Sequence, residues 1–202
     1  MSASVRPPGP VRTLVLGPAA SGKSEVAEHL LGAEPRVTYL ATGDVPEGPS
    51  GGRPGTRDDE WAARVARHRA RRPTSWTTLE TADVAAALAH RPEALLLDAV
   101  GTWLTGVLDR AGAWDGRQGW RESVAADVDA FVAAWTGRVH RAVAVSEEVG
   151  WGVVPGTASG RLFRDELGGL NRRLASASDE VLLVVAGRVL DLGAGPRRHP
   201  AG

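Results

Sequence analysis

The stretch that decides the fold is Thr13-Leu-Val-Leu-Gly17-Pro-Ala-Ala-Ser-Gly22-Lys23-Ser24-Glu-Val-Ala-Glu-His-Leu-Leu31. Its first four residues form a short apolar run typical of a buried parallel strand. Residues 17–24 then fit the pattern G-x-x-x-x-G-K-[ST] at every fixed position. Two glycines let the backbone turn tightly and bring its N–H groups close to an anion. The stretch therefore predicts a strand, a phosphate-binding loop and a helix that begins near Lys23.

The side chains of this loop have distinct expected roles. Lys23 is expected to reach the β- and γ-phosphates of a nucleotide and to be exposed to that ligand, not buried in the core. Ser24 is expected to help hold Mg²⁺. A glycine-rich turn before an ordinary helix is the alternative, which the strand–loop–helix context disfavours. The predicted nucleotide-binding residues of the loop are Gly17, Pro18, Ala19, Ala20, Ser21, Gly22, Lys23 and Ser24.

Composition limits the class of protein. The chain has 202 residues, of which 43% are hydrophobic, enough for one compact α/β domain with a real core. Its formal net charge is zero, which argues against a general nucleic-acid binder. It contains no cysteine, so disulfides and thiolate metal sites are excluded. Because no signal peptide or membrane-length apolar stretch is evident, we expect a soluble, cytoplasmic protein without a membrane span.

The organisation along the chain follows from its glycine and proline content. Residues 1–10 read as a flexible leader, residues 11–192 as one P-loop domain, and residues 193–202 as a tail. Residues 43–57 are rich in glycine and proline and are expected to form an irregular, mobile loop. This loop would leave the carboxyl edge of the sheet, where open α/β folds bind ligands. It is expected either to cover a substrate or to be a tolerated insertion.

Apolar strands alternate with helical patterns along the remaining chain. This alternation predicts a single-domain α/β P-loop NTPase fold, with a mostly parallel sheet flanked by helices. Further strands are expected at 36–42, 76–80, 94–98, 141–146 and 180–186, with an edge hairpin at 189–192. Helices are expected at 58–72, 83–90, 102–110, 121–135 and 160–177, with Asp83 in the first turn of its helix. The glycine-containing residues 147–155 are expected to form either a shaped binding loop or an ordinary strand-to-helix connection.

Two further features point to nucleotide chemistry. The apolar strand Ala94–Asp98 ends in a carboxylate, the pattern of an acid that supports Mg²⁺ in P-loop enzymes. In the predicted helix at 58–72, Arg64 and Arg72 flank His68, and nearby positive charge keeps an imidazole neutral and nucleophilic. Taken alone, the second pattern is more typical of a solvated basic helix face with a bystander histidine.

The chain resembles a known family in motifs more specific than the phosphate loop. The likeness runs from about residue 13 to residue 192. Its motifs are Gly17–Ser24, Tyr39–Thr42, Asp58–His68, Leu95–Asp98, Glu148–Pro155 and Arg161–Asn171. Together they resemble the bifunctional adenosylcobinamide kinase / adenosylcobinamide-phosphate guanylyltransferase of cobalamin biosynthesis.

The resemblance implies two reactions with ATP and GTP as substrates and Mg²⁺ as cofactor. A kinase step phosphorylates the aminopropanol hydroxyl of adenosylcobinamide with ATP or GTP. In the second step a histidine, matched by His68, takes GMP from GTP, releases pyrophosphate and passes GMP to the cobinamide phosphate. The resemblance thus overturns the bystander interpretation of His68. It also implies a homo-oligomer, a trimer, and the further nucleotide contacts Thr42, Gly43, Asp44, Arg69, Ala70, Arg71, Arg72, Glu80 and Asp98.

The chain departs from the family pattern at three places. Glu147 stands where the pattern usually has Asn, Gly106 replaces an Asn, and the loop at 43–57 is longer than expected. The first two departures are expected to alter corrinoid or nucleotide contacts.

Three rival functions make different demands on the sequence. A regulatory GTPase would need an Asn-Lys-x-Asp tetrapeptide, which the chain lacks. A recombinase-like nucleic-acid ATPase would bind DNA with strong salt dependence. A small-molecule kinase without the transferase activity is the nearest rival.

Overall fold

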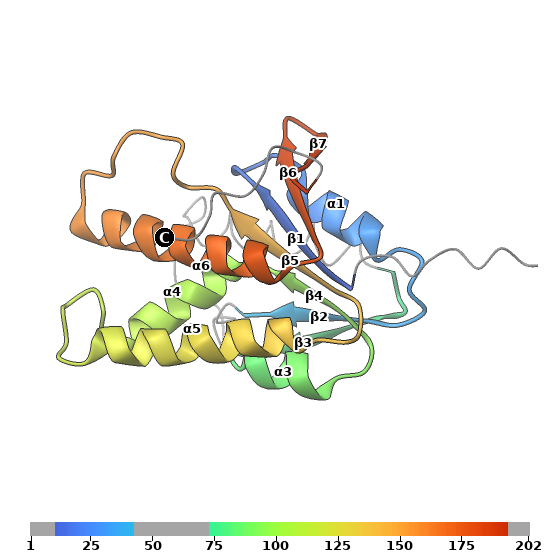
Figure 1. The fold of residues 1–202 in the computed structure, drawn as a ribbon, viewed down its shortest axis with the longest axis horizontal. Helices are drawn as coiled ribbons and strands as arrows, with labels where there is room; N and C mark the ends of the chain where they lie inside the picture. The colour runs from blue at the N-terminus through green and yellow to red at the C-terminus, as the bar shows by residue number, and fades with distance from the viewer. Residues whose placement is uncertain (1–10, 43–72, 194–202) are drawn as a thin grey trace, which may run out of the picture.

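A seven-stranded sheet forms the centre of the computed structural model, which describes residues 11–42 and 73–193 (Figure 1). The strands lie in the order β3-β2-β4-β5-β1-β6-β7, and every neighbouring pair is parallel except the antiparallel pair β6–β7. This confirms the predicted mostly parallel α/β sheet with an edge hairpin. The strands are β1 (Arg12–Gly17), β2 (Val37–Ala41), β3 (Trp76–Glu80), β4 (Ala94–Asp98), β5 (Ala142–Glu147), β6 (Glu180–Val185) and β7 (Arg188–Asp191).

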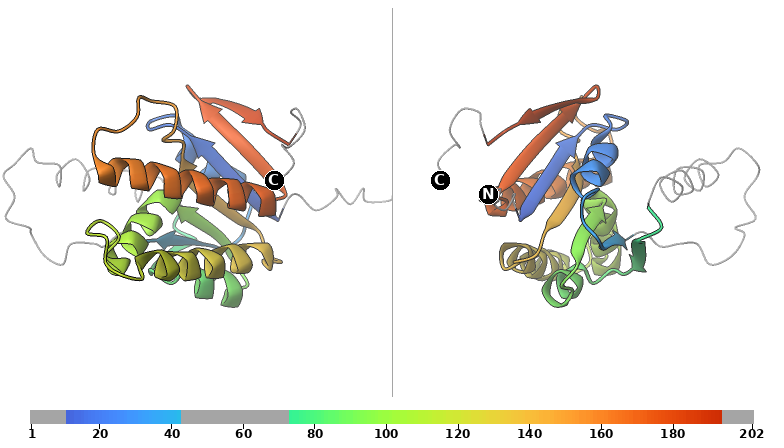
Figure 2. Two further views of the ribbon diagram at one scale, coloured as in Figure 1. Left: turned by 60° about the vertical axis from the view of Figure 1, so that its left-hand side comes forward. Right: turned by 90° about the vertical axis from the view of Figure 1, so that its right-hand side faces the viewer.

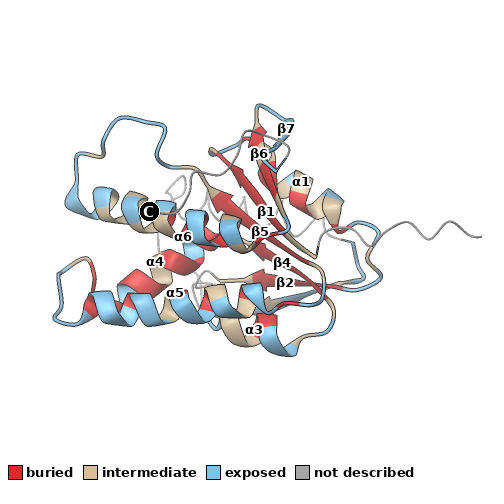
Figure 3. Cartoon of the chain, viewed as in Figure 1, coloured by how far each residue is buried: buried red, intermediate tan, exposed pale blue. Residues whose placement is uncertain are grey.

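Helices cover both faces of the sheet. Figure 2 shows α1 on one face and the other four described helices on the opposite face. Successive strand residues point to opposite faces, so Leu14 and Leu16 join the larger core cluster and Val15 joins the cluster under α1. Because both faces are covered, the central strands are almost continuously buried (Figure 3). The helices are α1 (Lys23–Leu30), α3 (Val84–His90), α4 (Val100–Ala111), α5 (Trp120–Thr136) and α6 (Ala158–Ala177).

The ends of several elements differ from the sequence-based expectation. Asp83 is the N-cap of α3, not a residue of its first turn, because its side chain accepts a hydrogen bond from the Ala86 amide. Both α4 and α6 begin two residues earlier than expected, and Thr157 caps α6 in the same way. Strand β5 continues to Glu147, so this carboxylate belongs to the sheet edge and not to the following loop.

The predicted helix at 58–72 and the whole of the predicted loop at 43–57 lie outside the described residues, as do the leader and nearly all of the tail. Within residues 11–42 and 73–193, no helix is long and apolar enough to cross a membrane.

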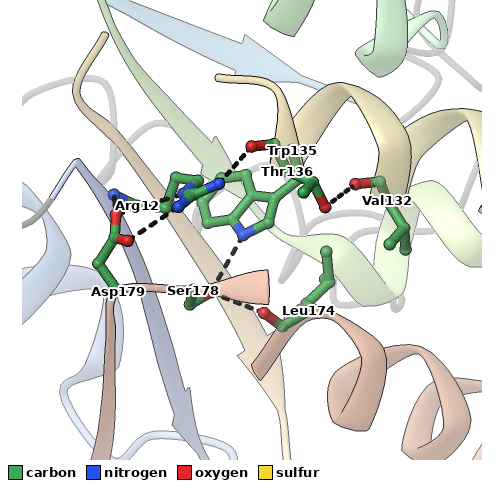
Figure 4. Close-up of polar contacts among 7 residues, drawn as sticks. All are labelled: Arg12, Val132, Trp135, Thr136, Leu174, Ser178 and Asp179. Carbon is green, nitrogen blue, oxygen red and sulfur yellow. Dashed lines mark hydrogen bonds and ion pairs between the residues drawn. The ribbon is translucent and has the colours of Figure 1, made fainter. Parts of the chain in front are cut away.

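A hydrogen-bonded cluster ties the amino ends of β1 and β6 to α5 and α6 (Figure 4). The Arg12 guanidinium donates to Asp179 at 2.8 and 3.2 Å. The indole N–H of the fully buried Trp135 donates to Ser178 Oγ at 3.0 Å, and Ser178 Oγ donates in turn to the Leu174 carbonyl at 2.7 Å. The polar groups of this cluster therefore bind one another and hold the two helices at the amino edge of the sheet.

Candidate active site

The predicted phosphate loop lies at the carboxyl end of β1. Gly22 has φ of +93°, which glycine adopts without strain. A side chain at Gly17 would meet the Val184 carbonyl at 2.5 Å, so the loop needs glycine there because it passes close to β6. The amide of Gly187, in the β6–β7 turn, donates to the Ser21 carbonyl at 3.0 Å. The terminal hairpin thereby braces the loop.

Lys23 is buried, contrary to the expected exposure to ligand. It is the first residue of α1, and only 8% of its surface is accessible. Its ammonium group donates to the Pro18 carbonyl at 3.2 Å and lies 3.9 Å from Glu147 Oε1. The loop folds around the aliphatic stem, so the charged end reaches into the loop and not into bulk solvent.

Glu147 ends β5 beside the phosphate loop, whereas in the sequence it stands out only as a departure from the family pattern. It pairs in register with Gly17, since β5 lies directly beside β1. Burial raises the pKa of its carboxyl, and the charge of Asp98 adds to that rise. The charge of Lys23 and two nearby backbone N–H groups, of Glu147 itself and of Gly101, oppose it, although neither N–H group reaches Oε2 with full hydrogen-bond geometry. Its Oε2 atom is buried and has no hydrogen-bond partner among the described residues. The available signal was an acidic residue at the carboxyl end of a predicted central strand.

Asp98 ends β4, the next strand beyond β5. The hydroxyl of Tyr39 donates to its backbone carbonyl at 3.1 Å, and Thr42 Oγ1 donates to the adjacent Ala99 carbonyl at 3.4 Å. The sheet therefore brings Lys23, Glu147, Asp98 and Thr42 to one edge in that order.

Glu80 lies apart from this group. It ends β3, the outermost parallel strand, four strand spacings from β1. At about 4.8 Å per spacing, the two strands are roughly 19 Å apart. The described residues thus give no contact between Glu80 and the phosphate loop, and its assignment to nucleotide binding stays a prediction.

His68, Gly43, Asp44 and residues 69–72 lie outside the described residues. Their predicted roles stay predictions. The segment that contains them leaves the sheet at Thr42, which is at the same edge as the phosphate loop.

Mg²⁺ is the metal that the oxygen atoms of Ser24 and Asp98 would suit. Among the described residues, no three His, Asp or Glu side chains come together as a metal cluster. Mg²⁺ in nucleotide enzymes takes one or two protein oxygens and completes its shell with phosphate oxygens and water. The hydroxyl of Ser24, in the first turn of α1, and the carboxylate of Asp98, at the end of β4, fit that requirement.

A pocket of about 630 Å³ opens beside Glu147. Its walls are one face of α4, Thr42 at the end of β2, and Phe163 of α6. Gly106, the second departure from the family pattern, also lines it. This volume is in the usual range of small-molecule sites.

Comparison with known proteins identifies the family. Residues 13–192 match the family model of cobinamide kinase / cobinamide phosphate guanyltransferase. The chain belongs to this family. The match spans every motif on which the resemblance was based.

Three bifunctional adenosylcobalamin biosynthesis proteins are similar over most of their length. The CobU protein of Salmonella typhimurium is 36% identical over 188 residues, which are 86% of this chain and 95% of the relative. The CobU protein of Escherichia coli is 37% identical over 184 residues, with the same two coverages. The CobP protein of Pseudomonas aeruginosa is 35% identical over 193 residues, which are 92% of this chain and 99% of the relative.

Solved structures support the fold. A type III secretion ATPase of pathogenic bacteria matches 85% of this chain with a TM-score of 0.53 and 12% identity. The ATPase EscN of enteropathogenic E. coli matches 88% with a TM-score of 0.51 and 12% identity. The chain covers only 50% and 43% of those two proteins. At this identity the likeness concerns the fold, and it agrees with the predicted P-loop NTPase architecture.

Proposed function

We propose that this member of the cobinamide kinase / cobinamide phosphate guanyltransferase family catalyses both reactions of its family name. It phosphorylates the aminopropanol hydroxyl of adenosylcobinamide with ATP or GTP. It then transfers GMP from GTP to the phosphate, giving adenosylcobinamide-GDP and pyrophosphate. The observation that carries the proposal is the family match over residues 13–192, because this range includes both the phosphate loop and His68.

The geometry of the loop supports nucleotide binding. The glycine-rich turn and the amino end of α1 present backbone N–H groups to an anion, and the helix dipole adds positive potential there. Lys23 is held by two weak contacts, to Pro18 and Glu147, that a bound phosphate would replace. Mg²⁺ held by Ser24 and Asp98 would neutralise charge on the phosphates.

We propose that GMP transfer passes through a covalent intermediate on His68. An imidazole nitrogen attacks the α-phosphorus of GTP, and the bond to the β-phosphate oxygen breaks, releasing pyrophosphate. An oxygen of the cobinamide phosphate then attacks the same phosphorus, and the N–P bond breaks. Neighbouring arginines would offset the phosphate charge and keep the imidazole neutral before attack.

Labelling with α-³²P-GTP tests the intermediate. The full chain is expected to acquire acid-labile, alkali-stable label that peptide mapping places on His68. The variant His68→Ala should lose GMP transfer and retain phosphorylation of cobinamide. His140→Ala is the matched control, because this exposed histidine lies just before β5, at the amino edge of the sheet. Label on another residue, or full transferase activity in His68→Ala, would contradict the assignment.

A kinase without the transferase activity is the second candidate. The observation that favours it is that the phosphate loop and Asp98 lie at one edge of the sheet with the pocket beside them, and these parts would suffice for phosphoryl transfer without His68. This candidate predicts turnover of cobinamide with ATP but no label from α-³²P-GTP.

We further propose that the chain forms a homotrimer, as the resemblance implies. Exposed apolar side chains in the loop after β5 support self-association, since Trp151 and Val154 are about 60% accessible and Val153 is 96% accessible. Light scattering coupled to size exclusion measures the mass directly. A monomeric mass at micromolar concentration would contradict the proposal.

A further inference from the structure

Helix α4 is divided into two faces along its length. Its buried face packs into the core through Val100, Trp103, Leu104, Val107, Leu108 and Ala111. Its other face lines the pocket through Gly101, Thr102, Thr105, Gly106, Asp109 and Arg110. These positions follow the spacing i, i+1, i+4, i+5, which keeps them on one side of a helix. At 1.5 Å per residue the pocket wall extends for about 13 Å.

The lining of this wall is small and polar, not apolar. Two glycines and two threonines leave room, and a side chain added at Gly106 would meet only the flexible end of Arg110, at 3.4 Å. Arg110 lies 3.6 Å from Asp127 on α5, and both side chains are about half exposed. The wall therefore offers space for a ligand, with hydroxyl groups along its first half and charged groups at its far end.

The near end of the pocket lies beside the phosphate loop. Glu147 Oε1 is 3.9 Å from the Lys23 ammonium, and the other oxygen, Oε2, is buried without a hydrogen-bond partner among the described residues. A side chain at Gly101 would come within 2.6 Å of Oε2, so the glycine is what makes room for the carboxylate. A buried carboxylate oxygen without a donor is costly unless a ligand supplies one.

We propose that this pocket binds the phosphoryl acceptor, an alcohol on an amide-bearing arm, and that Glu147 Oε2 accepts the hydrogen bond of its hydroxyl. The inference rests on the kinase step of the proposed function. Because a P-loop lysine contacts the β- and γ-phosphates, a carboxylate within 4 Å of it lies next to the group being transferred. The rest of the wall, with Thr102, Asp109 and Arg110, would take the amide groups of the arm.

The transfer step is balanced as follows. The acceptor oxygen forms a bond to the γ-phosphorus, and the bond from that phosphorus to the β–γ bridging oxygen breaks. The electron pair leaves with the nucleoside diphosphate. The hydroxyl proton passes to the Glu147 carboxylate and then to solvent. The main contribution of Glu147 to catalysis is to position the acceptor hydroxyl for attack on the γ-phosphorus.

Steady-state kinetics of the full chain, with cobinamide and MgATP varied separately, tests the inference. Glu147→Gln is expected to lower kcat/KM for cobinamide by about 100-fold and to change the KM for ATP by less than about twofold. Gly106→Leu fills the pocket wall and is expected to raise the KM for cobinamide about tenfold with ATP binding unchanged.

Matched controls make the same chemical changes elsewhere. Glu122→Gln removes one carboxylate on the exposed side of α5, and Gly169→Leu adds the same side chain to α6, where the structure has open space. Both should retain wild-type kinetics. Unchanged cobinamide kinetics in Glu147→Gln and Gly106→Leu would overturn the inference, as would an equal loss of ATP binding, which would place the nucleotide base in the pocket.

The inference and the proposed function can fail separately. A wild-type chain that phosphorylates no cobinamide would contradict the proposed function. Equilibrium dialysis of cobinamide against the wild type and Gly106→Leu then tests the pocket by itself. Wild-type binding that Gly106→Leu does not weaken, or no binding to the wild type, would overturn the inference.

Discussion

The two edges of the sheet differ in how completely their buried polar groups are satisfied, although Ser146 Oγ at the carboxyl edge does donate to Asn171 Oδ1 at 2.6 Å. At the amino edge, Ser178 Oγ accepts from Trp135 and donates to Leu174, and the buried Arg138 guanidinium donates to backbone carbonyls, including that of Leu88 at 2.8 Å. At the carboxyl edge, Ser21 Oγ and Glu147 Oε2 are buried and have no partner among the described residues.

The difference separates stability from function. Satisfied polar groups fix one conformation and add to stability, whereas unsatisfied ones cost stability and are retained where a ligand completes them. Variants at the amino edge should therefore change unfolding, and variants at the carboxyl edge should change activity.

The largest expected effect is at the carboxyl edge. Lys23→Ala should lower kinase turnover by at least about 100-fold, because no other group in the loop supplies a positive charge to the γ-phosphate. The melting temperature should change little, since the contacts of the ammonium among the described residues are a hydrogen bond of 3.2 Å and an ion pair of 3.9 Å. Saturating MgATP with cobinamide is the assay, and unchanged turnover would contradict the P-loop assignment.

Lys23 also allows a chemical version of this test, because it is the only lysine in the chain. A lysine-directed reagent should inactivate the enzyme, and bound MgATP should protect it. Modification at Lys23 that leaves full activity would separate this residue from catalysis.

At the amino edge, Trp135→Ala should lower the free energy of unfolding by about 3–5 kcal/mol. It removes the largest side chain that is fully buried among the described residues, and it leaves Ser178 without its donor. Turnover per folded molecule should stay at the wild-type level. Urea denaturation measures the first quantity, and Val139→Ala, at a position 76% exposed, serves as the control. Equal destabilisation by both variants would contradict the proposed division between the edges.

The smallest expected effects come from two carboxylates whose contributions have opposite signs. Hydrogen bonds from Arg12 lower the pKa of the Asp179 carboxyl. The native state then binds a proton less tightly than the unfolded chain, so this contribution to stability is present above the unfolded pKa and is lost as the pH falls through the folded pKa. Asp179→Asn should destabilise by about 1 kcal/mol near neutral pH, a modest value because the pair is partly exposed.

For Glu147, burial raises the pKa, so the native state binds a proton more tightly than the unfolded chain. Stability then falls as the pH rises from the unfolded pKa to the folded pKa. Glu147→Gln should raise the free energy of unfolding at neutral pH by up to about 1 kcal/mol. Denaturation curves from pH 4 to 8 measure the free energy of unfolding of both variants. If Asp179→Asn and Glu147→Gln changed this free energy in the same direction at neutral pH, the comparison would be contradicted.

The sequence by itself determined the strand–loop–helix unit, the parallel sheet and Asp98 at a strand end. These features follow from local patterns: the glycine spacing of the loop, apolar runs of strand length and a terminal acid. The same patterns predicted Trp76–Glu80 as an edge strand and the terminal hairpin, both confirmed in the structure. Matching to the family supplied His68 and the other residues whose placement lies outside the described ranges.

Only the tertiary structure decided what surrounds those residues. The strand order puts β5 between β1 and β4. Because β5 lies directly beside β1, its last residue, Glu147, lies beside Lys23. No local pattern encodes that order, because parallel strands are joined by long crossovers and pair with partners distant in sequence. The burial of Lys23 and the pocket along α4 arise from the same packing of distant segments, whereas the sequence alone predicted an exposed lysine and, at 102–110, a helix with no assigned role.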